Sequence, residues 1–326
     1  MPTIRHQDAF HIAFCVDNHY FRAMGAMIAS IIAHNPRRRF VFHVFAFHVS
    51  EDNARRMKEI ELNPDIQVVP HVVDPSLFQG FADMIASSYY SLSTFTRLIV
   101  PSVLKDVTDR VFYLDADMLC IGSLDELAAM DLEDTVALVV EDVGWSTPEG
   151  RDGRYSVLGM KARHYFNAGI LYINIHEWEK HRISETAIEL LLSNREKLTF
   201  NDQDALNIVL EGRVRYIPIK WNYIYSMIAD LKRGKLSMDA VGDAVILHFA
   251  GLIKPWNDWS GHVARELYLR YHALSAWRDT PLDTAPLNHK EMRIHSRSLM
   301  KRGRIALGLY WYLRFAQAAL ARKLKR

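Results

Sequence analysis

The first 260 residues alternate short apolar runs with amphipathic runs of helical period, and this alternation restricts the fold more than any other feature of the chain. The run RFVFHVFAF at 39–47 is apolar at nearly every position, as a strand covered on both faces would be. The strand-like runs are 11–16, 39–47, 66–73, 110–117, 135–140, 168–175 and 244–249. One helical run begins at Phe21 and is ended by Asn35-Pro36, and another follows Ser93. The remaining helical runs are at about 51–62, 184–193 and 202–211. Strands alternating with helices predict an α/β fold with a single mixed, mostly parallel sheet flanked by helices.

Composition favours a globular protein in a reducing compartment. Hydrophobic residues make up 49% of the chain and charged residues 24%, which is ordinary for folded proteins and argues against disorder. The two cysteines, Cys15 and Cys120, lie in apolar strand-like runs, so a disulfide scaffold and a four-cysteine zinc site are excluded. The sequence shows neither a secretory signal pattern nor an uncharged apolar run long enough to span a bilayer. We therefore expect a cytoplasmic protein.

The organisation changes near Trp259, after which the pattern is helical to the end of the chain. This predicts two parts, a sheet-containing domain at 1–260 and a helical C-terminal extension at 261–326. Within the first part, residues 141–163 have no helix or strand period. A loop of that length in a compact domain is usually functional or disordered.

Positive charge is concentrated in the C-terminal extension. Residues 288–326 contain eleven Lys or Arg and one acid, Glu291, so the segment carries +10 and the rest of the chain −8. A basic tail on an acidic body indicates an anionic partner, which could be nucleic acid, a membrane surface or a phosphorylated acceptor. No nucleic-acid-binding motif accompanies the charge, which argues against the first of these.

The chain carries no glycine-rich nucleotide motif, because neither G-x-G-x-x-G nor G-x-x-x-x-G-K-[ST] occurs. A bound nucleotide would need a metal or basic side chains to hold its phosphates. Asp115 and Asp117 end an apolar strand, where two hard oxygen donors could bind Mg²⁺ or Mn²⁺ bridging a diphosphate. The alternative is an ordinary loop, since Asp-x-Asp also occurs at Asp202 and Asp204.

His248 interrupts an apolar strand and is followed by Gly251 and Lys254. A neutral imidazole could complete an oxygen, oxygen, nitrogen ligand set, which suits Mn²⁺ better than Ca²⁺. Lys254 could pair with a phosphate as a point charge. A lone histidine in a strand is otherwise a hydrogen-bonded core residue, and that alternative stays open from this residue alone.

Six short segments stand in a fixed order along the first part of the chain. They are DNHY at 17–20, STFTR at 93–97, FYLDADML at 112–119, FNAGILYINIHEW at 166–178, NDQDALN at 201–207 and HFAGLIKPW at 248–256. In this order they resemble glycosyltransferase family 8, the retaining enzymes with a GT-A fold. The resemblance covers about residues 11–260, and its most specific part is the pairing of Y-L-D-x-D with H-F-x-G-x-x-K-P-W.

The resemblance implies a role for individual residues around a UDP-sugar donor. The uridine contacts would be Asp17 and Tyr20, with Tyr20 stacking on the base. The ligands of Mn²⁺, for which Mg²⁺ is an alternative, would be Asp115, Asp117 and His248. The diphosphate would be held by Gly251 and Lys254, and the donor sugar would be lined by Arg97, Asn167, Asp202 and Gln203. Family members often carry Asp-Asn where this chain has Asn18-His19, so a ribose contact at His19 is a departure from the pattern.

The chemistry of transfer needs two kinds of group. Charge develops on the diphosphate as UDP leaves, and a divalent metal and Lys254 would stabilise it. An oxocarbenium-like sugar needs a polar or anionic group on its other face, and Asp202 and Gln203 are the candidates for this catalytic role. Asp202 could instead cap the helix that begins near it. A carboxylate nucleophile and a front-face route both remain open.

The last residues, 304–326, join an apolar stretch to a basic end. Ile305, Leu309, Tyr312 and Leu313 share a helical face, and Arg322 and Lys323 follow. Aromatic side chains beside a basic cluster suit a helix lying in a bilayer interface, held by anionic headgroups. The alternative is a helix packed on the catalytic domain with its basic end in water.

Bacterial members of the family that extend lipopolysaccharide core carry similar basic C-terminal extensions. The resemblance therefore implies a Mn²⁺-dependent hexosyltransferase that moves glucose or galactose from UDP to a lipid-linked lipopolysaccharide core acceptor with an α-linkage. Its expected location is the inner face of the cytoplasmic membrane, reached through residues 288–326. The same transfer to a protein or another surface glycan is one alternative. A sugar-nucleotide-binding protein without activity is another, and a nucleotidyltransferase is a third, although no triphosphate loop is evident.

Overall fold

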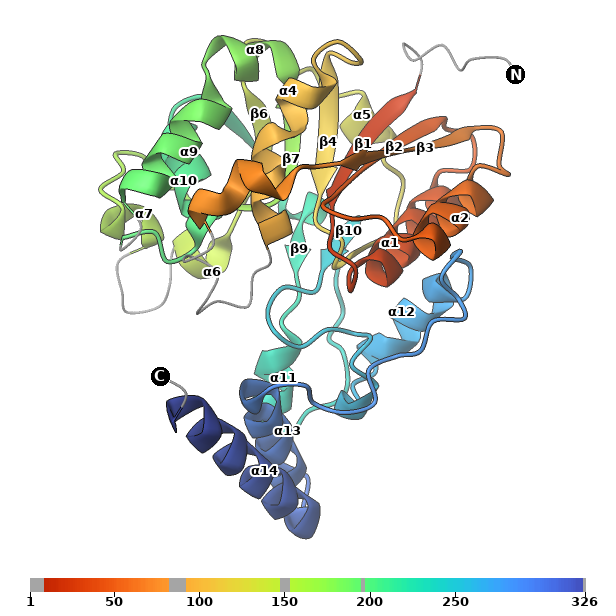
Figure 1. The fold of residues 1–326 in the computed structure, drawn as a ribbon, viewed down its shortest axis with the longest axis vertical. Helices are drawn as coiled ribbons and strands as arrows, with labels where there is room; N and C mark the ends of the chain where they lie inside the picture. Colours follow the sequence, from red (N-terminus) through yellow and green to blue (C-terminus); the bar gives the residue numbers. More distant parts are fainter. Residues whose placement is uncertain (1–8, 82–91, 147–152, 195–196, 325–326) are drawn as a thin grey trace.

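A computed structural model describes residues 9–81, 92–146, 153–194 and 197–324. A large sheet forms the centre of the molecule, and a helical hairpin at the C-terminal end stands apart from it (Figure 1). The sheet has the order β3-β2-β1-β4-β7-β6-β8. Its strands are β1 (Phe10–Cys15), β2 (Phe40–Ala46), β3 (Ile66–Val72), β4 (Arg110–Leu114), β6 (Ala137–Glu141), β7 (Phe166–Asn174) and β8 (Val214–Ile217). The expected mixed, mostly parallel sheet is confirmed.

One strand runs against the others. β7 is antiparallel to both of its neighbours, β4 and β6, whereas β3, β2, β1 and β4 are mutually parallel and β6 is parallel to β8. The first residues of β7 therefore lie at the sheet edge where β4 and β6 end. β8 is a strand that the apolar runs did not predict, because two of its four residues are only partly buried and Tyr216 is exposed.

Helices cover both faces of this sheet, and the sequence patterns explain which face each takes. In β2 every residue is buried, with Phe42 facing one apolar cluster and Phe45 the other. α1 (Phe21–His34) and α2 (Glu51–Ile60) lie on the first face, and Ser50 caps α2 by accepting from the Asn53 amide. The second face is covered by η3 (Leu92–Ile99), α4 (Val100–Leu104), α8 (Ile175–Lys180), α9 (Ile183–Ser193) and α10 (Asn201–Val209).

A second, three-stranded sheet lies beside the first. It consists of β5 (Met118–Cys120), β10 (Ile246–His248) and β9 (Tyr223–Ile224), in the order β5-β10-β9. The strand expected at 244–249 thus forms, but it lies in this small sheet, antiparallel to β5 with His248 opposite Met118. The chain leaves the large sheet at Asp115 and enters the small sheet at Met118. The Asp-Ala-Asp segment is therefore the junction between the two sheets.

Two further expectations need correction. Residues 141–163 contain α6 (Val143–Ser146) and α7 (Arg154–Val157), although 147–152 lie outside the described residues. These single-turn helices are too short to leave a period in the sequence. The prediction of continuous helix after Trp259 is wrong for 273–288, which follow α12 (Ala264–His272) without helix. Two prolines fall in that stretch, and Asn288 then caps the next helix by accepting from the Lys290 and Glu291 amides.

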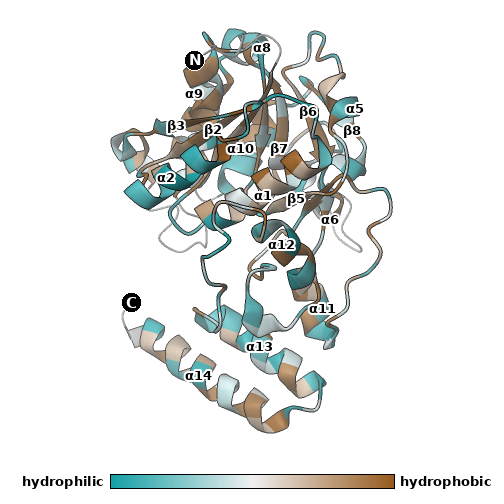
Figure 2. Cartoon of the chain, turned by 90° about the vertical axis from the view of Figure 1, so that its right-hand side faces the viewer, coloured by the Kyte–Doolittle hydropathy of each residue, from teal (hydrophilic) through white to brown (hydrophobic). Residues whose placement is uncertain are grey.

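The C-terminal helices form a hairpin of α13 (His289–Lys301) and α14 (Ile305–Leu324). Gly308 allows the close crossing, since a Cβ there would meet Met300 Cγ at 2.6 Å, and Ser296 donates a hydrogen bond to its carbonyl at 2.8 Å. Figure 2 shows apolar and polar residues mixed along α14, many of them exposed. Within the described residues, no helix is both long and apolar enough to cross a membrane. The remaining short elements are η2 (Pro75–Phe81), α5 (Asp125–Ala128), η4 (Ile219–Trp221), α11 (Met227–Arg233) and η5 (Asp258–Ser260).

Candidate active site

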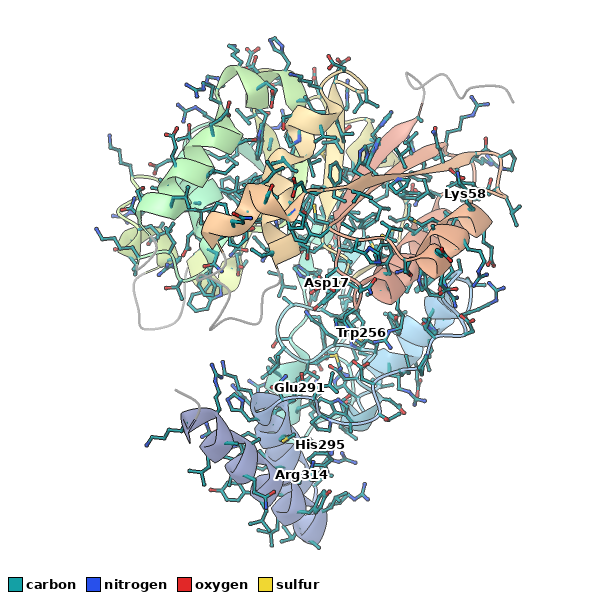
Figure 3. All side chains as sticks on the ribbon, in the orientation of Figure 1. Asp17, Lys58, Trp256, Glu291, His295 and Arg314 are labelled. Atoms are coloured by element: carbon teal, nitrogen blue, oxygen red, sulfur yellow. The ribbon has the colours of Figure 1, made fainter. Side chains whose placement is uncertain are left out.

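A cavity of about 1360 Å³ opens at the edge where the parallel strands end. The residues singled out from the sequence all contribute to its lining: Asp17, Tyr20, Arg97, Asp115, Asp117, Asn167, Asp202, Gln203, His248, Gly251 and Lys254. In Figure 3, Asp17 and Trp256 lie below the large sheet, between it and the C-terminal hairpin. The reversed direction of β7 brings Asn167, near its first residue, to this same edge. The fold thus gathers into one site residues spread over most of the chain.

The three proposed metal ligands lie together. One ligand atom from each of Asp115, Asp117 and His248 falls within 4.8 Å of the others. The Oδ1 atom of Asp117 is buried without a hydrogen-bond partner, and it lies 3.4 Å from His248 Nε2. A buried carboxylate oxygen left unsatisfied is costly unless a cation binds it. The residues present therefore fit a divalent metal.

Asn222 determines which nitrogen of His248 is available. Its Oδ1 lies 3.0 Å from His248 Nδ1, while its Nδ2 donates to Asn167 Oδ1 at 2.9 Å. The oxygen of Asn222 can only accept, so Nδ1 carries the imidazole proton and donates it. The lone pair on Nε2 is then directed toward Asp117, as metal-binding histidines require.

Position 169 on β7 requires glycine because neighbouring side chains approach it closely. A Cβ at this position would lie 2.8 Å from Asn167 Oδ1 and from His248 Cε1, and 2.9 Å from Asp115 Oδ2. The candidate ligands crowd this strand, so only glycine leaves room for them. Gly251 is required for a different reason, because its φ of +99° is one that other residues rarely adopt.

Two cationic side chains, Lys254 and Arg97, already pair with carboxylates of the site. Lys254 forms an ion pair with Asp117 Oδ2 and donates to the Phe249 carbonyl at 2.8 Å. Arg97 lies between two acids, with Nη2 at 3.1 Å from Asp115 Oδ1 and Nε at 3.0 Å from Asp202 Oδ2. Burial alone would raise the pKa of Asp117, but the Lys254 ammonium, with His248 beside it, outweighs burial and holds that pKa well below its usual range.

Asp202 is a buried carboxylate facing the cavity, not a helix cap. α10 begins at Asn201 with Phe200 at the N-cap position, so Asp202 lies within the first turn and is not the N-cap residue. Burial raises the pKa of Asp202 to about 6, against the opposing effect of Arg97. Its neighbour Gln203 is held by Asn167 Nδ2 at 3.2 Å and by the Ala168 amide at 3.0 Å. Asp204, the third residue of this second Asp-x-Asp, points away from the cavity and pairs with Arg154.

Aromatic residues line the other end of the cavity. The rings of Tyr20 and Trp256 meet edge to face at 5.7 Å, and Trp256 is 6% exposed. Asp17 Oδ1 accepts from the His19 amide at 2.9 Å, and Asn18 Oδ1 accepts from Asn53 Nδ2 at 3.3 Å. The loop after β1 is thus fixed by its own hydrogen bonds and by α2.

Sequence reasoning missed several residues of the site. Asn222, Gly169 and Asp142 are the clearest, and Asp142 accepts from Asn167 Nδ2 at 3.3 Å at the cavity wall. Gly169 lies inside the segment at 166–178, but nothing in the sequence shows why this position must be glycine. Asn222 and Asp142 carry no local pattern, because they reach the site through the pairing of distant strands.

Comparisons with known proteins agree with this geometry. The sequence profile of glycosyl transferase family 8 matches residues 11–260, and that of the glycosyl transferase family 8 C-terminal region matches residues 264–317. The chain is 29% identical to lipopolysaccharide 1,3-galactosyltransferase of Salmonella typhimurium, over 97% of this chain and 94% of that protein. It is 27% identical to lipopolysaccharide 1,2-glucosyltransferase of Escherichia coli, over 87% and 84% of the two chains.

A solved structure shares the fold. The galactosyltransferase LgtC, crystallised with donor and acceptor sugar analogues, superposes with a TM-score of 0.67 and 26% identity. The match covers 85% of this chain and 98% of that one.

Proposed function

This chain belongs to glycosyltransferase family 8 and is a hexosyltransferase, and we propose that it moves glucose or galactose from UDP to a lipopolysaccharide core oligosaccharide. The reaction would use a divalent metal, preferably Mn²⁺, and would retain the configuration at the anomeric carbon. The observation that carries the proposal is a cavity in which the unsatisfied Asp117 oxygen lies within 4.8 Å of ligand atoms of His248 and Asp115. The lipopolysaccharide transferases among its relatives support the choice of acceptor.

Each end of the cavity suits one part of the donor. Tyr20 and Trp256 offer aromatic surface for a base, and Asp17 offers a carboxylate beside it. A metal held by Asp115, Asp117 and His248 would supply positive charge that stabilises a leaving diphosphate. Lys254, 8% exposed and adjoining the same carboxylate, would transfer its contact to a phosphate oxygen.

The sugar would lie at the opposite end, near Asn167, Asp202 and Gln203. Arg97 holds Asp202 in place there, and the pKa of about 6 for Asp202 keeps its carboxylate partly protonated near neutrality. The acceptor would approach past α6, where Trp145 is 40% exposed and packs against Phe200 with ring centroids 4.5 Å apart. An exposed indole bordering a polar cavity is suited to stacking on a sugar ring.

The experiment is UDP binding and UDP release with a panel of UDP-sugars, with Mn²⁺ and then with EDTA. We expect Mn²⁺-dependent UDP binding, and release from one donor that EDTA abolishes. Asp117→Asn should lose both, while Asp125→Asn, which removes an exposed aspartate paired with Arg38 on another surface, should lose neither. Mn²⁺-dependent binding without turnover on any donor and acceptor would favour a sugar-nucleotide-binding protein. Absence of both would refute the proposal.

We also propose that α14 contacts the anionic surface in which a lipid-linked acceptor is embedded. α14 packs on α13, and several of its large apolar side chains face water, Leu309 being 51% and Leu313 62% exposed. Basic residues follow them at Arg322 and Lys323. Apolar side chains next to cations suit an interfacial helix.

Flotation with vesicles containing anionic lipid tests this contact. The double variant Leu309→Glu, Leu313→Glu should float much less than the parent. Leu62→Glu is the matched control, because Leu62 is 82% exposed but lies after α2. Equal flotation of the double variant and the parent would rule out the membrane contact without affecting the assignment of the donor site.

A further inference from the structure

Asp204 lies directly behind the cavity and is completely buried. Arg154 of α7 approaches it with two donors, Nε at 2.9 Å from Oδ1 and Nη2 against Oδ2. The Phe200 amide also donates to Oδ2, at 2.8 Å. A carboxylate paired in this way accepts hydrogen bonds and donates none.

Tyr165 joins this ion pair to the cavity. Its hydroxyl donates to Asp204 Oδ1 at 2.7 Å and receives the Gln203 Nε2 donor at 3.1 Å. A phenol has one proton, and Asp204 takes it. Burial and the Asp204 charge raise the pKa of Tyr165, so the proton stays on the hydroxyl. The oxygen of Tyr165 can therefore only accept from Gln203.

The other end of the Gln203 amide is fixed as well. Its Oε1 receives the Ala168 amide at 3.0 Å and Asn167 Nδ2 at 3.2 Å. A backbone N–H can only donate, so it requires the oxygen at that end, just as Tyr165 requires the nitrogen at the other. The amide of Gln203 has one allowed orientation, and it also hydrogen-bonds the Asp142 carboxylate at the wall of the cavity that Gln203 lines.

We propose that Tyr165 is a positioning residue, which the Arg154–Asp204 pair polarises so that the Gln203 amide keeps this one orientation where it meets the donor sugar. The inference rests on the proposed function, since it concerns how Gln203 meets a sugar. It adds a requirement that the sequence did not indicate: Asp204, the acid of the second Asp-x-Asp that points away from the cavity, acts through Tyr165 on the side-chain amide of Gln203.

The kinetic test is Tyr165→Phe, which removes the hydroxyl and keeps the ring. We expect kcat for donor hydrolysis and for transfer to fall about tenfold, with KM for the donor and Mn²⁺-dependent UDP affinity unchanged within twofold. Tyr172→Phe is the matched control, because Tyr172 is a buried tyrosine of β7 outside the cavity lining, and its kcat should not change. An unchanged kcat in Tyr165→Phe, or a parallel loss of UDP affinity, would overturn the positioning role.

A spectroscopic readout needs no turnover. The chain contains five glutamines, so selective ¹⁵N-glutamine labelling gives few side-chain amide signals, and the Gln203 pair is identified by its disappearance in Gln203→Met. We expect this pair to be protected from water exchange in the parent and to lose that protection in Tyr165→Phe but not in Tyr172→Phe. Unaltered protection in Tyr165→Phe would refute the proposal even if the parent proves inactive. Inactivity of the parent with intact protection would count against the proposed function alone.

Discussion

Lys254 and Asp117 form an ion pair inside the cavity, and the second oxygen of the same carboxylate has no partner. The ammonium group therefore balances only part of what a divalent cation would balance. Both side chains are nearly buried, with 9% and 12% of their surfaces exposed, so this charge is poorly screened by water. A metal entering the site would compete with Lys254 for Asp117 unless a phosphate took the lysine away.

Lys254→Met should separate these two binding events. We expect Mn²⁺ affinity without nucleotide to rise severalfold, since the competing cation is gone, and UDP affinity with Mn²⁺ to fall about tenfold, since a charged phosphate contact is lost. Calorimetric titration of each ligand, alone and with the other, measures both. Lys58→Met, at an exposed surface pair with Glu61, should change neither (Figure 3). Weaker Mn²⁺ binding in the nucleotide-free Lys254 variant would contradict the competition.

Asn222→Ala should weaken metal binding without removing a ligand. Without the Asn222 oxygen, the His248 ring can rotate and its proton can move from Nδ1 to Nε2. Loss of such a contact typically lowers metal affinity about 10–100-fold. Mn²⁺ titration followed by electron paramagnetic resonance is the measurement. Asn63→Ala, at an exposed turn before β3, serves as the control. Parent-like affinity in Asn222→Ala would show that His248 needs no support from this side chain.

Asp202 should give the reaction a pH dependence in the mildly acidic range. Its pKa is raised to about 6, so the folded protein holds this proton more tightly than the unfolded chain does. The carboxylate becomes charged, and able to stabilise a cationic sugar, only as pH rises through about 6. The same shift means that its contribution to stability is present at low pH and is lost as pH rises through that value.

The profile of kcat/KM for donor hydrolysis between pH 4.5 and pH 8, taken as an approximate range, tests this. We expect a rise with a midpoint near pH 6 in the parent and a low, flat profile in Asp202→Asn. A parent-like rise in that variant would assign the titration to another group.

His295 should make the C-terminal hairpin sensitive to acid. Its ring lies between Trp259 and Trp311, at 5.0 and 5.4 Å, and burial, with Arg302 and Arg304 adding to it, lowers its pKa to about 4. A depressed histidine pKa means that stability is full above about pH 6.5 and falls as pH drops toward 4.

Between those pH values, the titration of His295 should contribute about 1.4 kcal/mol per pH unit to the slope of the unfolding free energy against pH. Denaturant unfolding followed by tryptophan fluorescence at several pH values measures this slope. It should be smaller in His295→Phe than in the parent by that contribution. His176→Phe, with an 81% exposed side chain, should retain the slope of the parent. Identical slopes in His295→Phe and the parent would mean that the ring is protonated at no cost in the folded hairpin.

The periodicity of the sequence predicted most of the large sheet because its central strands are buried on both faces. β8 was not predicted because it is a four-residue edge strand with only one buried residue, and β5 and β9 were not predicted because strands of two or three residues have no period. The candidate metal ligands were visible because Asp115 and Asp117 end an apolar strand and His248 interrupts one. Asn222 and Tyr165 were not visible, since their roles arise from hydrogen bonds across elements that only tertiary structure brings together.

The pairing of β5 with β10 has a consequence for how this site tolerates change. His248 lies opposite Met118, the residue that immediately follows Asp117, so the ligand most distant in sequence is held to the other two by a short ladder of backbone hydrogen bonds. Segments between these two strands that contribute no residue to the donor site can lengthen, shorten or diverge while the ladder keeps its register. Evolution could therefore rebuild the wall facing the acceptor, including α6 and the approach to β8, and change the sugar that receives the hexose while leaving the metal geometry as it is.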